Sequence, residues 1–135
     1  MALARPATLA PARITVEAWI RRLGTPGRWR YVVSSGGQDC NFASFGLYTG
    51  PTDGLAFSVS GGGRYELSPS AAAGTVWDGA WDYAVGTYDG AHVRLYLDGV
   101  EIGAGSPTQL AIDYGLAGRC TWTGRPPDPP ACAPA

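Results

Sequence analysis

The chain has no lysine, one histidine, three cysteines and no long apolar run. Its 10 basic residues are balanced by 11 acidic ones, and the formal net charge is -1 at pH 7. Without a basic excess, the chain lacks the electrostatic surface that nucleic acids or anionic membranes require. A single histidine and the absence of a C-x-x-C motif argue against a structural zinc site. No segment approaches the roughly 20 apolar residues of a membrane-spanning helix, so we expect no membrane insertion.

Length and composition indicate one domain rich in β-structure. With 135 residues, 45% of them hydrophobic, the chain is long and apolar enough to bury a core. Its 20 glycines and 11 prolines favour many turns over long helices. We expect an irregular segment over 1–13, the domain over 14–117 and a Pro-rich tail over 118–135.

The first strand is expected over 14–23, where apolar and polar side chains alternate. The side that we expect to face the core comprises Ile14, Val16, Ala18 and Ile20. Trp19 falls on the opposite side of this strand. Further strands are expected over 29–34, 45–49, 55–60, 65–67 and 110–114. About eight strands without a helix are typical of an all-β sandwich.

Three consecutive antiparallel strands are expected over 77–103, because two Asp-Gly pairs interrupt runs of alternating apolar residues. At Asp98-Gly99 a two-residue turn sets Leu97 opposite Val100. This register is favoured because a slip of one residue would turn the apolar side chains to water.

The turn at Asp89-Gly90 is predicted to be longer. We favour a loop over 88–92, with Gly90 at positive φ, which would set Leu97 opposite Tyr83. Trp81 begins this group of strands and is the tryptophan that we most expect in the core.

Five ordered segments carry a family pattern: ITVEAWI (14–20), SFGLYTG (44–50), GLAFSVS (54–60), VWDGAW (76–81) and GTYDGAHVRLYLDGVEIG (86–103). The last is the most specific, because aromatic-Asp-Gly, Arg-Leu-Tyr and Asp-Gly follow one another in order. Over about two-thirds of its length the chain resembles the bacterial laminin-G-like (LamG) domains of the concanavalin A-like lectin/glucanase superfamily.

This resemblance implies a jelly-roll β-sandwich of two antiparallel sheets and a role in glycan or protein binding, sometimes with calcium. It also implies an extracellular or cell-surface location, although residues 1–19 lack the uninterrupted apolar core of a signal peptide. Two departures are visible. Only residues 1–13 precede the first strand, and residues 112–114 match the family's closing strand poorly. We therefore expect a truncated or divergent domain that lacks terminal strands, or one in which a partner copy pairs with the open sheet edges to form a homo-oligomer.

Catalysis is not expected. Glycan-active enzymes of this superfamily need paired carboxylates, whereas Glu17, Glu66 and Glu101 are isolated in the sequence. His92 lies in a turn with no acid spaced beside it, and no nucleophile elbow is present. The sequence favours a non-catalytic, lectin-like module that binds carbohydrate or a surface glycoconjugate. A structural or protein–protein interaction module of a larger extracellular protein, and a degenerate glucanase or lyase fragment, remain as alternatives.

The candidate sugar site combines Trp29 and Tyr48, as an aromatic platform, with Asn41 and Asp53. Aromatic faces grip the C–H edges of sugars, and amide or carboxylate groups fix the hydroxyls. The competing interpretation is that these aromatic side chains fill the core or cap its ends.

No cofactor is required by the sequence, but calcium is considered because it binds clusters of loop oxygens. The candidate calcium ligands are Asp39, Asn41 and Asp53. Asp78, Asp89 and Asp98 are better explained as turn formers, because Asp caps its own backbone in tight turns.

Three cysteines allow one disulfide and one free thiol, or three thiols. Cys40 and Cys120 follow strands whose ends could meet at one end of the sandwich, so they form the disulfide candidate. Pairing of Cys120 with Cys132 is the local alternative.

Overall fold

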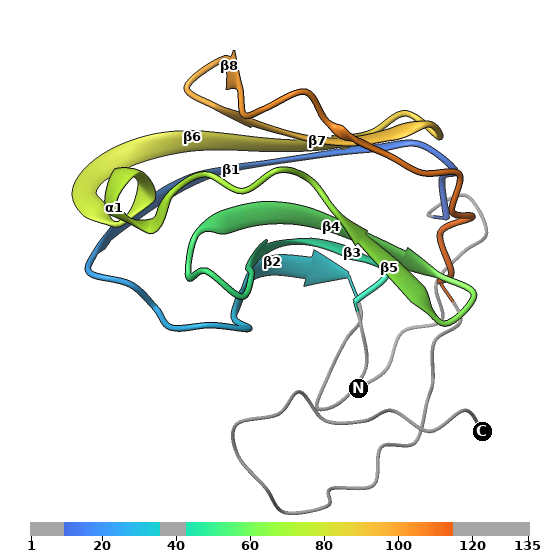
Figure 1. Cartoon of the computed structure of the whole chain (residues 1–135), viewed down its shortest axis with the longest axis horizontal. Helices are drawn as coiled ribbons and strands as arrows, with labels where there is room; N and C mark the ends of the chain where they lie inside the picture. The colour runs from blue at the N-terminus through green and yellow to red at the C-terminus, as the bar shows by residue number, and fades with distance from the viewer. Residues whose placement is uncertain (1–9, 36–42, 115–135) are drawn as a thin grey trace, which may run out of the picture.

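The computed structural model describes residues 10–35 and 43–114, which form a sandwich of two antiparallel sheets (Figure 1). Sheet A has the strand order β1-β6-β7-β8, with β9 also paired to β7, and sheet B has the order β2-β3-β4-β5. The strands are β1 (Ile14–Leu23), β2 (Tyr31–Ser35), β3 (Phe45–Thr49), β4 (Leu55–Gly61), β5 (Arg64–Leu67), β6 (Asp78–Tyr88), β7 (His92–Leu97), β8 (Val100–Glu101) and β9 (Ser106–Pro107). The all-β jelly-roll expectation is confirmed.

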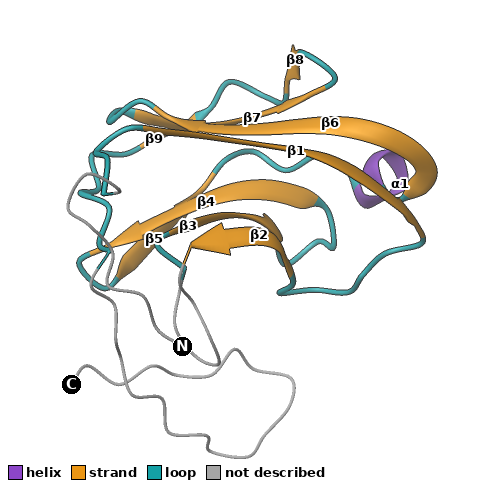
Figure 2. Ribbon diagram, turned by 180° about the vertical axis from the view of Figure 1, so that it is seen from behind, coloured by secondary structure: helices purple, strands orange, loops and turns teal. Residues whose placement is uncertain are grey.

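One short helix, α1 (Ala73–Val76), closes the end of the sandwich where β6 begins (Figure 2). The sequence did not predict it. The strand expected over 110–114 is wrong, because this segment makes single hydrogen bonds to different partners rather than a ladder. The Tyr88 hydroxyl donates to the Leu110 carbonyl at 2.7 Å, and the Asp113 N–H donates to the Ser60 carbonyl at 3.0 Å.

The prediction for β1 is confirmed in both its ends and its faces. β1 pairs with β6 in antiparallel register, with Trp19 opposite Tyr83 and Arg21 opposite Trp81. Ile20 is buried, whereas 65% of the Trp19 side chain is exposed. Alternation along the strand therefore turns Trp19 and Arg21 to the outer face of sheet A.

The group of three strands, β6 to β8, is confirmed, and so is the turn that sets Leu97 opposite Val100. Asp98 and Gly99 both have positive φ there, as the favoured two-residue hairpin turn requires.

The predicted register of the β6–β7 turn is wrong by one residue. Leu97 lies opposite Ala84, not Tyr83. The Asp89 carboxylate accepts the N–H groups of Ala91 and His92, each at 2.7 Å. These two bonds shorten the loop and keep the apolar faces of β6 and β7 aligned. Gly90 has positive φ, as expected.

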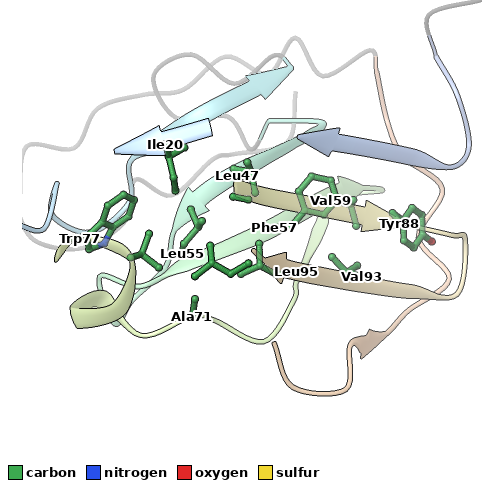
Figure 3. Close-up of a cluster of buried hydrophobic side chains, with 13 residues drawn as sticks. Ile20, Leu47, Leu55, Phe57, Val59, Ala71, Trp77, Tyr88, Val93 and Leu95 are labelled. Atoms are coloured by element: carbon green, nitrogen blue, oxygen red, sulfur yellow. The ribbon is translucent and has the colours of Figure 1, made fainter. Parts of the chain in front are cut away.

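The core lies between the two sheets (Figure 3). Its largest fully buried side chains include Phe57, Leu47, Leu55 and Leu95. Both faces of β4 are buried, which makes this strand the centre of the molecule. Burial of each such side chain stabilises the fold by roughly 1.5–3 kcal/mol before conformational entropy is subtracted.

Candidate functional site

Trp29 and Tyr48, the aromatic pair predicted from sequence, are in contact. Their ring centroids lie 5.9 Å apart, and the Tyr48 ring lies 4.8 Å from that of Tyr31. Trp29 precedes β2 with φ of 61°, a left-handed conformation that is rare for a bulky residue. Two hydrogen bonds to Thr49 hold it there: the Trp29 N–H donates to the Thr49 carbonyl at 2.9 Å, and the Arg30 N–H donates to the Thr49 hydroxyl at 2.8 Å.

The two rings differ in accessibility. Trp29 is 38% exposed, but Tyr48 is only 9% exposed. Tyr48 lies on the outer face of sheet B in a tyrosine cluster with Tyr31 and Tyr65, around a hollow of about 10 Å³ that also contacts Ser58 and Ser60. Burial raises the pKa of Tyr31 and of Tyr48, so both hydroxyls stay protonated at neutral pH. A hollow of this size accommodates about one water molecule but no sugar.

Asp53, the third predicted site residue, contacts Arg28 and Trp77. Its carboxylate Oδ1 lies 3.6 Å from Nε of Arg28, and its carbonyl accepts the indole N–H of Trp77 at 2.7 Å. Oδ1 is buried and accepts no hydrogen bond within the described part of the chain. Asn41 and Asp39, the other predicted ligands, lie outside the described residues.

The predicted cysteine bond also lies outside the described residues, because Cys40, Cys120 and Cys132 fall in segments that the structure does not describe. Within residues 10–35 and 43–114, no three His, Cys, Asp or Glu side chains cluster as metal ligands would.

The outer face of sheet A carries a second aromatic surface. The rings of Trp19 and Tyr83 lie 5.0 Å apart, and the Tyr83 hydroxyl donates to the Glu17 carboxylate. This bond raises the pKa of Tyr83 because it favours the protonated phenol beside a negative charge. The register of β1 and β6 places these three side chains on one face.

Further along this face lies an open groove of about 540 Å³, here called the Trp81 groove. It is lined by Arg21, Arg22, Leu23, Asp78, Gly79 and Trp81. Trp81 is 59% exposed, and the Arg21 guanidinium lies 6.0 Å from the centre of its ring. The expectation that Trp81 fills the core is wrong. Its position opposite Arg21 fixes it on the outer face, and Trp77 is buried instead.

Backbone bonds hold the polar groups of the Trp81 groove in place. Nε of Arg21 donates to the Gly79 carbonyl at 2.9 Å, and Nε of Arg22 donates to the Gly24 carbonyl at 3.0 Å. The Asp78 carboxylate accepts the Ala80 N–H at 2.8 Å. The bonds of Arg21 and Arg22 each use only one of the five N–H groups of the guanidinium, so both arginines retain donors for a ligand.

Sequence reasoning missed this groove, although one signal was present. The alternation of β1 places Arg21 on the same face as Trp19, and this much could be seen in the sequence. The register needed to match Arg21 with Trp81 came only from the structure.

Most of the described acidic side chains are bound to backbone or basic groups, whereas Asp82 lies close enough to Asp78 and Asp98 for their charges to raise its pKa. The Asp78 and Asp89 carboxylates each accept the N–H two residues further on, which agrees with their predicted role in turns. The Asp98 carboxylate instead accepts the Tyr83 N–H of the neighbouring strand β6, although Asp98 itself lies in the β7–β8 turn. Glu101 pairs with Arg94 at 2.8 Å. None of these contacts joins two carboxylates.

A family model of the concanavalin A-like lectin/glucanase superfamily, Laminin_G_3, matches residues 1–128. The chain belongs to this superfamily. The laminin-G-like domains within it are in general carbohydrate- or protein-binding modules and are typically extracellular, although the superfamily also includes glycosidases. A search of curated proteins found no match to the chain. In the described part of this laminin-G-like domain, no helix has the length and apolar character to span a bilayer.

Proposed function

We propose that this laminin-G-like domain binds carbohydrate, or a surface glycoconjugate, without catalysing a reaction, and that one sugar ring stacks on Trp81. The observation that carries the proposal is the exposed Trp81 ring within an open groove that also presents two guanidinium groups and a carboxylate. A ring that is fixed by its neighbours loses little entropy on binding. The sugar hydroxyls would meet Arg21, Arg22 and Asp78.

Trp29 is the second candidate platform, because its ring is part exposed and its backbone is held in an unfavourable conformation. Strained backbone that the surrounding structure maintains is concentrated at functional sites. In this arrangement Tyr48 supports the Trp29 ring from behind. Asn41 and Asp53 remain the proposed polar partners, with the Asp53 carboxylate oriented by Arg28.

The absence of catalysis is supported by the distribution of acids. A glycosidase needs two carboxyl groups about 5–10 Å apart on either side of the scissile bond. Glu17, Glu101 and Asp89 are each bound to a different partner, and among the described residues Asp78 is the one acid that lines the Trp81 groove. The domain is proposed to act as a secreted or surface module whose weak single sites gain affinity through multivalency.

Alanine substitution of the two exposed tryptophans tests the sugar site. On a glycan array, followed by titration of Trp fluorescence, Trp81→Ala should weaken binding by about tenfold or more, which corresponds to about 1.4 kcal/mol. Trp29→Ala should change it less. The reverse order would move the site to Trp29 and Tyr48, and an array without any bound glycan would overturn the proposal.

We propose further that binding needs no cofactor. A chelator should leave both the melting temperature and glycan binding unchanged. A melting temperature that rises with added calcium, and no longer does so after Asp53→Asn, would instead assign calcium to the Asp53 loop.

A protein-binding role is the alternative, and one observation favours it. β2 lies at the edge of sheet B and exposes Val32 by 41% and Val33 by 38%. An apolar edge strand is suited to pairing with a strand of another protein. Loss of a captured partner after Val32→Arg, with no glycan bound by the unaltered chain, would favour this role.

A further inference from the structure

β1 is an unusually long edge strand. In the described part of the chain it pairs with β6 on one side and with no strand on the other. It has 10 residues, whereas the other edge strands, β2, β5, β8 and β9, have two to five. Edge strands present unpaired N–H and C=O groups, and natural proteins usually keep them short or cover them. β1 is long and carries an exposed tryptophan at its middle.

We propose that β1 pairs with β1 of a second copy of this chain. The two strands run antiparallel about a twofold axis, with Trp19 opposite the partner's Trp19. Glu17 then lies opposite the partner's Arg21, and Ala18 lies opposite the partner's Ile20. The result is one continuous sheet that runs through both copies, and the same patch is used on each side of the interface.

Charge selects this register. Glu17 and Arg21 lie two residues before and two residues after Trp19, on the same outer face. Rotation about the axis at Trp19 therefore sets opposite charges against each other twice. Opposite charges directly across a strand pair are favourable, and like charges there are unfavourable.

The other registers lack this match. A shift of four residues in either direction brings Glu17 against Glu17 or Arg21 against Arg21. A shift of two leaves both charges opposite uncharged residues. A shift of one would set Trp19 against the partner's Ile20, which would join the outer face of one copy to the core face of the other.

The bonds within each copy are compatible with this pairing. The Tyr83 hydroxyl bonds to Oε2 of Glu17, which leaves Oε1 for the partner's Arg21. Only Nε of Arg21 donates to Gly79, so the terminal N–H groups can reach the partner's Glu17. The two Trp19 rings form a cross-strand aromatic pair, which is among the more favourable contacts in antiparallel sheets.

The pairing has a consequence that rests on the proposed sugar site. Two Trp81 grooves would lie on one face of the joined sheet, separated by three strand spacings of about 4.8 Å and four residues of about 3.4 Å. Their separation would be about 20 Å along the diagonal. One extended polysaccharide could then occupy both grooves, which raises the apparent affinity without a new contact.

Sedimentation of the full chain over a concentration series tests the pairing, because it measures the molecular mass in solution and therefore the fraction of dimer. The unaltered chain should form dimers, and Glu17→Arg or Arg21→Glu should each raise the dissociation constant on the order of tenfold, because each sets two pairs of like charges against one another. The double variant should return to the value of the unaltered chain. Arg64→Glu, the same charge change on exposed β5, is the matched control and should have no effect.

Mixing gives the sharpest readout. An equal mixture of the Glu17→Arg and Arg21→Glu chains should form heterodimers, because two arginines of one chain then face two glutamates of the other. Recovery on mixing also shows that both variants are folded. A chain that stays monomeric, single variants that dimerise normally, or a mixture that fails to recover would each overturn the proposal.

Hydrogen exchange of the β1 amides gives a second test. β1 amide protons protected from exchange in a monomer would show that the chain's own residues cover the edge, and this would also overturn the proposal. The Trp81→Ala measurement, made on monomer, decides the sugar site separately.

Discussion

Gly86 of β6 lies directly against the ring of Phe57 of β4, across the interface between the two sheets. A β-carbon at position 86 would overlap Cγ and Cδ2 of that ring. Phe57 is the largest fully buried side chain of the described core. The missing side chain of Gly86 therefore sets how closely sheet A approaches sheet B at the centre of the domain.

Gly86→Ala should destabilise the fold by about 1–3 kcal/mol, because the added methyl group forces the Phe57 ring or the sheets to move. Gly74→Ala is the matched control. Gly74 lies in α1, and no atom lies within 4 Å of the position that a β-carbon would take there, so alanine should be neutral or stabilising. Urea unfolding measures both, and an equal effect of the two substitutions would contradict the packing argument.

Trp77→Phe should destabilise the fold by about 1–3 kcal/mol. The indole N–H of Trp77 donates to the Asp53 carbonyl at 2.7 Å, and the ring is only 6% exposed. Phenylalanine leaves this carbonyl without its donor and incompletely fills the space. Trp81→Phe on the exposed outer face is the control and should cost less than about 0.5 kcal/mol. The comparison fails if the two variants unfold at the same urea concentration.

Asp82 is predicted to make stability fall as pH rises. Its side chain is buried, its Oδ2 has no hydrogen-bond partner in the described structure, and burial followed by the charges of Asp98 and Asp78 raises its pKa above 3.8. A raised pKa means that the folded state binds the proton more tightly than the unfolded chain does. The loss of stability caused by the buried Asp82 charge is therefore absent below the pKa of the unfolded chain and complete above the pKa of the folded state.

Asp82→Asn should accordingly raise the melting temperature at pH 7. The gain should shrink as the pH falls toward the ordinary Asp value, since both chains are then neutral at this position. Thermal scans between acid and neutral pH measure it, and a gain that does not change with pH would rule out a charge effect.

Asp89 should have the opposite pH dependence. The backbone N–H groups of Ala91 and His92 donate to its carboxylate and lower its pKa below 3.8. Its contribution to stability is therefore present above the unfolded pKa and lost as pH falls through the folded pKa. Asp89→Ala should lower the melting temperature at neutral pH, and the difference should narrow in acid. Asp89→Asn retains an acceptor and should lose less; an equal loss would argue against the bonds in the turn.

Much of this arrangement followed from the alternation of side chains. The β1 pattern determined which face of the strand is buried, and the Asp-Gly turn at Asp98 determined the β7–β8 register. Both are local properties, because a strand's faces repeat every second residue and a two-residue turn fixes the pairing beside it. The contact between Trp29 and Tyr48 also agreed with expectation. Its role in binding stays a prediction.

What the sequence by itself determined was the class of fold and the sides of its strands, since these depend on residues close together in the chain. Tertiary structure decided the rest. Two bonds to Asp89 moved the β6–β7 register by one residue, and the pairing of β1 with β6 placed Trp81 beside Arg21 on the outer face. The β6–β7 register is local, but it depends on the hydrogen bonds of the Asp89 loop and not on the alternation of side chains. The pairing of β1 with β6 joins strands that are tens of residues apart, so no pattern within either strand specifies it.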